Sequence, residues 1–186
     1  MSAGGTSGNI HLGPGRLYYA PLGTTEPTNC SSALPSAWLV VGYTEDGSTV
    51  STEISTEAIM VAEELDPVSY SQIKRSTTVN LAMAEMAVSR LALAMGAGAP
   101  RTDTAASFEF PAPDAIVGVM LVWDSLDTPS ALNKRWIFRS VFPDGNISIS
   151  RKKAPNKATI PVSFLAALPT GQTSPVKVYP NSSGLI

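Results

Sequence analysis

The sequence has few of the residues from which catalytic and metal sites are built. Its 186 residues include one histidine, His11, and one cysteine, Cys30. His11 lies in a glycine-rich segment, where neither a positioned general base nor a histidine-based metal site is expected. A lone cysteine cannot form an intramolecular disulfide, which excludes a small secreted domain held together by bridges. The G-x-S-x-G nucleophile motif and the phosphate-binding glycine loop are also absent. We therefore expect no catalysis and no cofactor.

Charged residues and long apolar runs are scarce as well. Charged side chains make up 15% of the chain, although 44% of its residues are hydrophobic, whereas an average globular protein is about a quarter charged. This combination favours a surface that partners cover, and an ordinary β-domain rich in serine and threonine is the alternative. The longest apolar run, Ala115 to Trp123, is too short to span a membrane. Because Met1 to Gly15 lack the apolar stretch of a signal peptide, we expect synthesis in the cytoplasm and no membrane insertion.

The charges are divided unevenly along the chain. Residues 1–73 hold eight acids and one base, Arg16, which gives −7, and residues 74–186 hold seven acids and twelve bases, which gives +5. Two solvated faces would explain this division, but it also predicts two complementary surfaces that meet between subunits. The acids predicted at that interface are Glu45, Asp46, Glu53, Glu57, Glu63, Glu64 and Asp66, and the bases are Lys134, Arg135, Arg139, Arg151, Lys152, Lys153 and Lys157.

Two dense clusters of charged residues within these stretches are candidates for a chemical role. The acids from Glu63 to Asp66 could form a carboxylate pair, but without a cleft around them an exposed acidic loop is the better interpretation. The run from Arg151 to Lys153 could contact phosphate groups. Since no aromatic residues are interleaved with it, a solvated turn or a salt-bridging surface is favoured.

Strand patterns dominate the chain. Strands are predicted over 16–21, 38–43, 106–110, 115–123, 135–142, 146–150 and 159–166. Residues 48–64 alternate between two faces with acids on one of them, which indicates a half-exposed strand pair or a long loop. Residues 76–85 also alternate, and one of their faces is small and polar. The residues of that small face are Thr78, Asn80, Ala82 and Ala84.

One helix is predicted, over 86–96, because the period changes at Met86 and Gly96 supplies a natural helix stop. The resulting fold class is mainly β, a barrel-like sandwich of two packed sheets with one flanking helix. We divide the chain into an N-terminal arm (1–15), a β domain (16–166) with a long acidic loop at about 44–66, and a C-terminal arm (167–186).

The order of these pieces resembles the major tail tube proteins of siphophages. In that family an opening of the form G-x-L-Y-x-A-P-x-G-T is followed by an element of the form W-x-x-x-G-Y-x-x-x-D-G. The matching residues are Gly15, Leu17, Tyr18, Ala20, Pro21, Gly23 and Thr24 for the first, and Trp38, Gly42, Tyr43, Asp46 and Gly47 for the second. The likeness covers residues 15–98, and beyond them it rests on the strand pattern.

The resemblance implies a structural virion protein. Its copies would form hexameric rings that stack into a hollow tail tube, with an inner β-barrel lining the lumen through which double-stranded DNA and the tape measure protein pass. Its partners would be further copies of itself, the tape measure protein, and the tail terminator and distal tail proteins. We expect Thr78, Asn80, Ala82 and Ala84 to line the lumen.

Two other readings share the same strand pattern. The first is an inner-tube protein of a contractile tail or of a type VI-like secretion apparatus, which has the same fold. The second is a capsid decoration or adhesin-like β-domain that does not polymerise.

Overall fold

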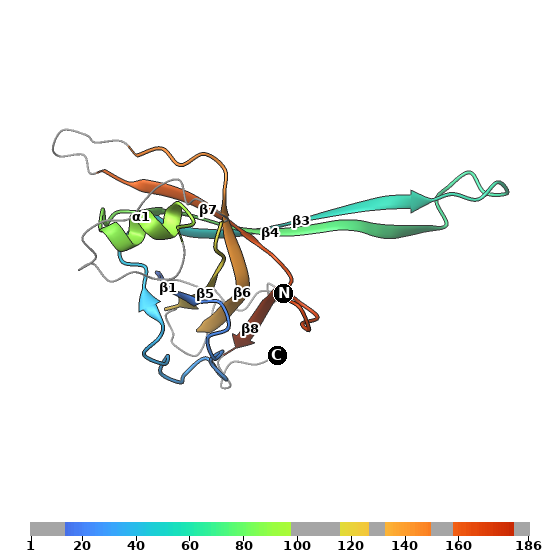
Figure 1. Cartoon of the computed structure of the whole chain (residues 1–186). Helices are drawn as coiled ribbons and strands as arrows, with labels where there is room; N and C mark the ends of the chain where they lie inside the picture. Colours follow the sequence, from blue (N-terminus) through green and yellow to red (C-terminus); the bar gives the residue numbers. More distant parts are fainter. Residues whose placement is uncertain (1–13, 98–115, 127–132, 150–157, 181–186) are drawn as a thin grey trace, which may run out of the picture.

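The computed structural model describes residues 14–97, 116–126, 133–149 and 158–180. In these ranges the chain forms eight strands and one short helix (Figure 1). The elements are β1 (Gly15–Pro21), β2 (Leu39–Val40), β3 (Thr44–Ile59), β4 (Ser69–Met83), α1 (Val88–Ala94), β5 (Val119–Ser125), β6 (Lys134–Asp144), β7 (Ile160–Ala166) and β8 (Val176–Pro180). The strand predicted over 106–110 lies outside the described residues.

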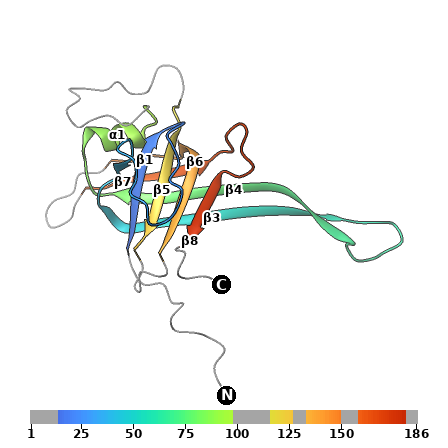
Figure 2. The same cartoon turned by 90° about the horizontal axis from the view of Figure 1, so that it is seen from below.

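All strand pairs are antiparallel, in the order β2-β1-β5-β6-β7-β4-β3, and β8 pairs with β6. Strand β6 joins the two halves of this sheet. Its first part, Lys134 to Phe138, lies between β5 and β8, while its last part, Val141 to Asp144, pairs with β7. The sheet therefore curls at β6 into a half-barrel, and α1 lies at one end of it (Figure 2). The predicted fold class, mainly β and barrel-like with one flanking helix, is confirmed.

The main core fills the inside of the curl. Alternate residues of the strands face inward, so that β1 contributes Leu17 and Tyr19 and β7 contributes Phe164. Strand β4 contributes Val79, Leu81 and Met83, the face that the alternation of residues 76–85 predicts to be opposite the small polar one. Helix α1 closes this core with Leu93 and Ala94.

A second, smaller core covers the other face of β1, β5 and β6. It contains Ala20, Trp38, Met120, Val122 and Ile137. The loop between β1 and β2 covers it, and the indole nitrogen of Trp38 donates to the Thr25 carbonyl at 3.2 Å. Strand β5 is therefore buried on both faces, which is the physical reason for its nearly continuous apolar sequence.

Several predicted boundaries differ from the observed ones. The helix spans seven residues, 88–94, instead of eleven, and residues 146–149 form no strand. Trp38 lies in a loop, and the strand after it is limited to Leu39 and Val40. Part of the predicted C-terminal arm is strand β8, which pairs with β6 from Lys134 to Phe138. Residues 48–59 belong to one long strand, so a strand pair, and not a loop, is the correct reading there.

Candidate assembly surfaces

The long hairpin of β3 and β4 extends far beyond the rest of the sheet (Figures 1 and 2). Strand β7 pairs with β4 from Thr78 to Met83, so β3 is the one described strand beside the nine residues from Ser69 to Thr77. Eight of these residues pair with β3, and Ile73 lies in a β-bulge. At about 3.4 Å per residue, this part of the hairpin is about 30 Å long. We call residues 53–75 the arm, a name that from here on refers to this hairpin and not to the predicted terminal segments. An isolated two-stranded hairpin is marginally stable in water, so a surface that covers the arm would stabilise it.

Both faces of the arm are exposed to water. The face that continues the core side of β3 carries Ile54 and Ala58, and Ala58 pairs with Tyr70. Ile54 and Tyr70 are exposed by 60% and 66% of their surfaces. The opposite face carries Glu53 and Glu57. The face of Ile54 also carries Arg75, and the face of the acids also carries Lys74, so each face mixes charged with apolar or neutral side chains. Large exposed apolar side chains such as Ile54 and Tyr70 are typical of a surface that packs against another molecule.

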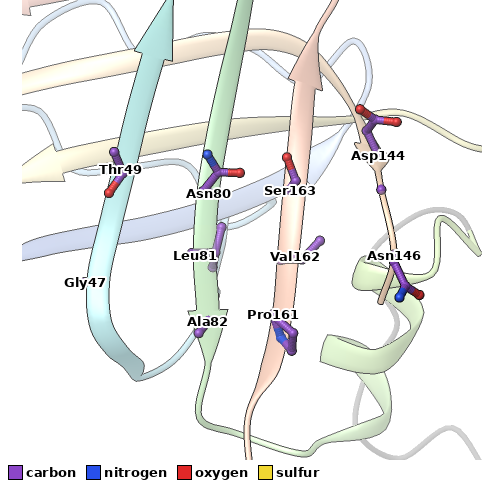
Figure 3. A pocket seen from close by; sticks show the side chains of 11 residues that line it. Gly47, Thr49, Asn80, Leu81, Ala82, Asp144, Asn146, Pro161, Val162 and Ser163 are labelled. Carbon is purple, nitrogen blue, oxygen red and sulfur yellow. The ribbon is translucent and has the colours of Figure 1, made fainter. Parts of the chain in front are cut away.

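The outer face of the curled sheet, away from the core, carries a row of small polar side chains. Thr49 on β3 pairs with Asn80 on β4, Asn80 pairs with Ser163 on β7, and Ser163 pairs with Asp144 on β6. Figure 3 shows Thr49, Asn80 and Ser163 side by side on adjacent strands. They border a shallow hollow of about 370 Å³, and among the residues lining it Asp144 is the charged one. This row is thus polar and weakly acidic, and on the same face Leu165 and Pro161 lie to either side of Ser163.

Two ion pairs fix the loop between β1 and β2 to this framework. Arg135 donates to the carboxylate of Asp124 with two hydrogen bonds, and its Nη1 donates to the carbonyls of Asn29 and Ser32 at 3.0 and 2.8 Å. Burial lowers the pKa of an arginine, but the hydrogen bonds to Asp124 outweigh this and hold the pKa of Arg135 above its usual value.

The second pair joins Arg139 to Glu26, with 2.7 Å between Nε and Oε1. Arg139 also donates to the Ser174 carbonyl at 2.8 Å, so it connects the β1–β2 loop to the segment that enters β8. Arg135 and Arg139 therefore each connect segments of one subunit that are far apart in the sequence.

The structure separates the predicted interface residues into three groups. On the arm and its tip, Glu53, Glu57, Glu63, Glu64 and Asp66 are exposed, as an interface requires. Arg135, 5% exposed, and Arg139 are engaged within the subunit. Sequence reasoning missed this role because their carboxylate partners, Asp124 and Glu26, lie on another strand and in a distant loop. Arg151, Lys152, Lys153 and Lys157 lie outside the described residues.

The remaining predicted residues have less distinctive positions. Glu45 is exposed and Lys134 half-buried, and each already interacts within the chain. The side chain of Asp46 lies outside the described part. Of the predicted lumen residues, Asn80 is exposed, and Thr78 and Ala82 are half-buried on the side of β4 away from the core. Ala84 is half-buried just after the end of β4. The described ranges contain no group of three or more metal-ligating side chains. No helix in these ranges has the length and apolar character needed to cross a bilayer.

The fold has a counterpart among solved structures. It is similar to a chain in a six-fold symmetrised cryo-EM structure of the anti-feeding prophage baseplate, with a TM-score of 0.53 and 10% sequence identity, over 98% of this chain and 99% of that one. The curled β-sheet with one flanking helix is thus a fold that the chain shares with a protein of that assembly. No curated protein matches the sequence.

The sequence itself gives the family. A family model described as phage tail tube protein matches residues 3–176. The chain belongs to the phage tail tube protein family, and it is a structural component of a phage tail.

Proposed function

We propose that this protein polymerises with copies of itself into hexameric rings, and that these rings stack into a hollow tail tube that conducts double-stranded DNA. In this proposal it acts without catalysis. The tape measure protein fills the tube during assembly, and the tail terminator and distal tail proteins bind its ends. Membership of the tail tube family supports the proposal.

The observation that carries the proposal is the half-sheet of β6, β7, β4 and β3. Among the described strands, β3 ends the strand order, so its outer N–H and C=O groups face away from the rest of this sheet. An open edge of this length templates pairing with another chain. When each subunit supplies the same half-sheet to a ring, the edges pair and the sheets close into a barrel.

The outer face of that half-sheet suits a lumen wall. Thr49, Asn80 and Ser163 offer no positive charge to hold phosphate, and Asp144 repels it weakly. DNA would therefore slide along the wall without being retained.

The acids of the arm supply one of the two complementary surfaces that a stacked assembly needs. Single exposed ion pairs contribute about 0–1 kcal/mol, but six-fold repetition adds them up and fixes the register of one ring on the next. Because Arg135 and Arg139 are engaged within the subunit, the predicted counterpart is reduced to Arg151, Lys152, Lys153 and Lys157.

An inner tube of a contractile tail or of a type VI-like secretion apparatus is the second candidate. The similarity of fold to a baseplate chain favours it. Binding of a sheath protein to the outside of the assembled tube would support this candidate.

Concentration-dependent sedimentation of the purified chain, followed by negative-stain microscopy, tests the proposal. We expect rings or tubes of uniform width above a critical concentration. Compact monomers at every concentration would contradict it and favour a decoration or adhesin-like domain.

A further inference from the structure

The hairpin of β3 and β4 has two open edges, and they differ. The outer edge of β3 runs from Ser48 to Ile59, and over this stretch β3 contains no extra residue. The edge of β4 from Ser69 to Thr77 is open as well, because β3 is the one described strand beside it. In Figures 1 and 2 no other described element lies beside the outer part of the arm. Each edge therefore presents backbone N–H and C=O groups with which a strand of another molecule can pair.

A β-bulge divides the open edge of β4. Ser55 pairs with Lys74, and its neighbour Thr56 pairs with Gln72. Ile73 is therefore an extra residue in β4. In a regular strand, alternate residues point their N–H and C=O groups toward the same edge. An extra residue shifts this alternation by one position and bends the strand, so a straight strand can pair with β4 on one side of Ile73 but not on both sides at once.

The two bases of the arm directly follow this bulge. Residues 53–75 contain five acids and two bases, Lys74 and Arg75, and both bases are exposed. Lys74 lies on the face of β4 that pairs with Ser55, and Arg75 lies on the opposite face, so both faces carry a cation beside the bulge. Bulges and charged side chains, lysine above all, are the means by which natural sheets protect an open edge. The β3 edge from Ser48 to Ile59 contains no lysine, arginine or proline.

The bulge lies at the centre of the open edge, where it obstructs pairing most. Two copies of this edge would overlap along its whole length in a two-fold antiparallel contact with residue 73 opposite residue 73. In that arrangement the two extra residues coincide, and Lys74 of one copy lies within about 10 Å of Lys74 of the other. This separation is close to the screening length at physiological salt, so the two cations repel each other. Backbone geometry and charge thus both oppose the longest contact between two β4 edges.

We infer that the bulge at Ile73, together with Lys74 and Arg75, protects the open edge of β4 from pairing with further copies of the chain. Of the two edges of the hairpin, β3 is then the one along which copies join. The inference rests on the proposed function, because it explains how a chain with two exposed edges assembles into ordered rings and not into aggregates of paired arms. Specificity of this kind is obtained by disfavouring the wrong contact.

Removal of the protection tests the inference directly. One variant deletes Ile73, which restores a regular ladder and leaves every other residue pair of the hairpin in register. A second variant carries Lys74→Thr and Arg75→Thr, and a third combines the deletion with both substitutions. Light scattering measures the concentration at which each chain begins to associate. For the combined variant this concentration should be roughly tenfold lower than for wild type, and the product should be irregular in electron micrographs and bind thioflavin T.

Net charge provides an internal control for these variants. Because the two substitutions remove two bases, the net charge changes from −2 to −4. A larger net charge increases the repulsion between copies and favours solubility. Stronger association of the combined variant therefore cannot result from a general loss of charge. Thermal unfolding of each variant below its association concentration checks that the β domain is intact.

The reverse experiment adds a lysine to each edge in turn. Thr56 on β3 and Gln72 on β4 are directly opposite each other in the arm, and both are exposed. Thr56→Lys should raise the critical concentration for polymerisation roughly tenfold, because it places a charge on the joining edge. Gln72→Lys is the matched control, and it should polymerise like wild type because the β4 edge is already closed to other copies.

The outcomes separate this inference from the proposed function. Association of the combined variant at the wild-type concentration, or equal impairment by Thr56→Lys and Gln72→Lys, would overturn the inference and leave the proposed function standing. If the deletion unfolds the chain, Lys74→Thr with Arg75→Thr decides, and unchanged association of that variant would overturn the inference. Failure of wild type to polymerise at any concentration would overturn the proposed function, while association of the β4 variants remains measurable on its own.

Discussion

The guanidinium of Arg135 on β6 binds both carboxylate oxygens of Asp124 on the adjacent strand β5, with Nε to Oδ1 at 2.6 Å and Nη2 to Oδ2 at 2.7 Å. The remaining nitrogen, Nη1, holds the β1–β2 loop through two carbonyls. One side chain thus connects the sheet to the loop that covers the second core.

Replacement of Asp124 should therefore destabilise the subunit strongly. The Arg135 side chain is 6% exposed and that of Asp124 is 15% exposed. Asp124→Ala leaves a buried charge without its partner, a change that costs about 3–5 kcal/mol. Urea unfolding of the monomer measures this free energy. Glu26→Ala is the matched comparison, and it should cost less because Glu26 is more exposed and Arg139 keeps its bond to Ser174. Equal losses would contradict this account.

Gly42, two residues before β3, lies against the carboxyl group of Glu85. Gly42 has φ of +101°, and a Cβ there would lie within 2.7 Å of three atoms of the Glu85 carboxyl group. Gly42→Ala should cost about 1–2 kcal/mol for the left-handed backbone, and about 1–3 kcal/mol more for displacing Glu85.

Gly23→Ala is the control for this variant, because Gly23 has φ of +83° but open space around its Cα. Thermal unfolding of both variants separates the backbone term from the clash. If the two variants melt at the same temperature, Glu85 moves away without cost and the packing argument for Gly42 is wrong.

The polar row on the outer sheet face should determine how strongly the tube binds DNA. Asn80→Lys adds one positive charge per subunit at an exposed site, so the monomer should lose less than about 0.5 kcal/mol of stability. Tubes of this variant should bind short double-stranded DNA measurably, with an affinity that falls steeply as salt rises.

Wild-type tubes should bind such DNA weakly at all salt concentrations, and Asn80→Ser tubes should behave like wild type. Fluorescence titration of labelled DNA into preformed tubes measures all three. Identical affinities for wild type and Asn80→Lys would show that this face does not line the lumen.

Cys30 should make the stability of the fold depend on alkaline pH. The thiol is half-buried, and burial raises its pKa, while the nearby charge of Arg135 acts in the opposite direction. Because the pKa is raised in the folded state, the folded chain keeps its proton at a pH where the unfolded chain loses it. The contribution of this group to stability is therefore present below the unfolded pKa and is lost as pH rises through the folded one.

The comparison of wild type with Cys30→Ser isolates this effect. Between pH 7 and 10 the wild-type free energy of unfolding should fall relative to that of the serine variant. A constant difference across this range would contradict the assigned pKa direction. Iodoacetamide should also modify the native thiol more slowly than the unfolded one at pH 8, since less of it is thiolate.

The sequence predicts those parts of the fold in which local pattern and burial agree. The alternation of β4 correctly separates Val79 and Leu81 from Asn80, because a strand with one buried face has period two. The apolar run of β5 predicts a central strand, and the structure shows why by burying it on both faces. Gly96 ends the helix with φ of +66°, near the predicted position.

Other features depend on contacts between distant residues and leave no local pattern. Strand β8 contains Lys177 and follows a proline-rich loop, so its segment has the composition of an arm, but pairing with β6 makes it a strand. Arg135 and Arg139 look like surface bases because a charged residue gives no sign of a partner on another strand, such as Asp124, or in a distant loop, such as Glu26. The sequence also does not predict the length of the arm, because its exposed strands pack against no core that would fix a pattern of buried residues.

The central claim is that this chain completes its sheet and covers its arm with copies of itself, around a hollow lumen. A cryo-EM reconstruction of the polymerised wild-type protein tests this most directly. We predict six subunits per ring, β3 paired with a strand of the neighbouring subunit, and Asn80 facing the lumen. A reconstruction in which β3 stays unpaired and the row from Thr49 to Ser163 faces outward would contradict the account.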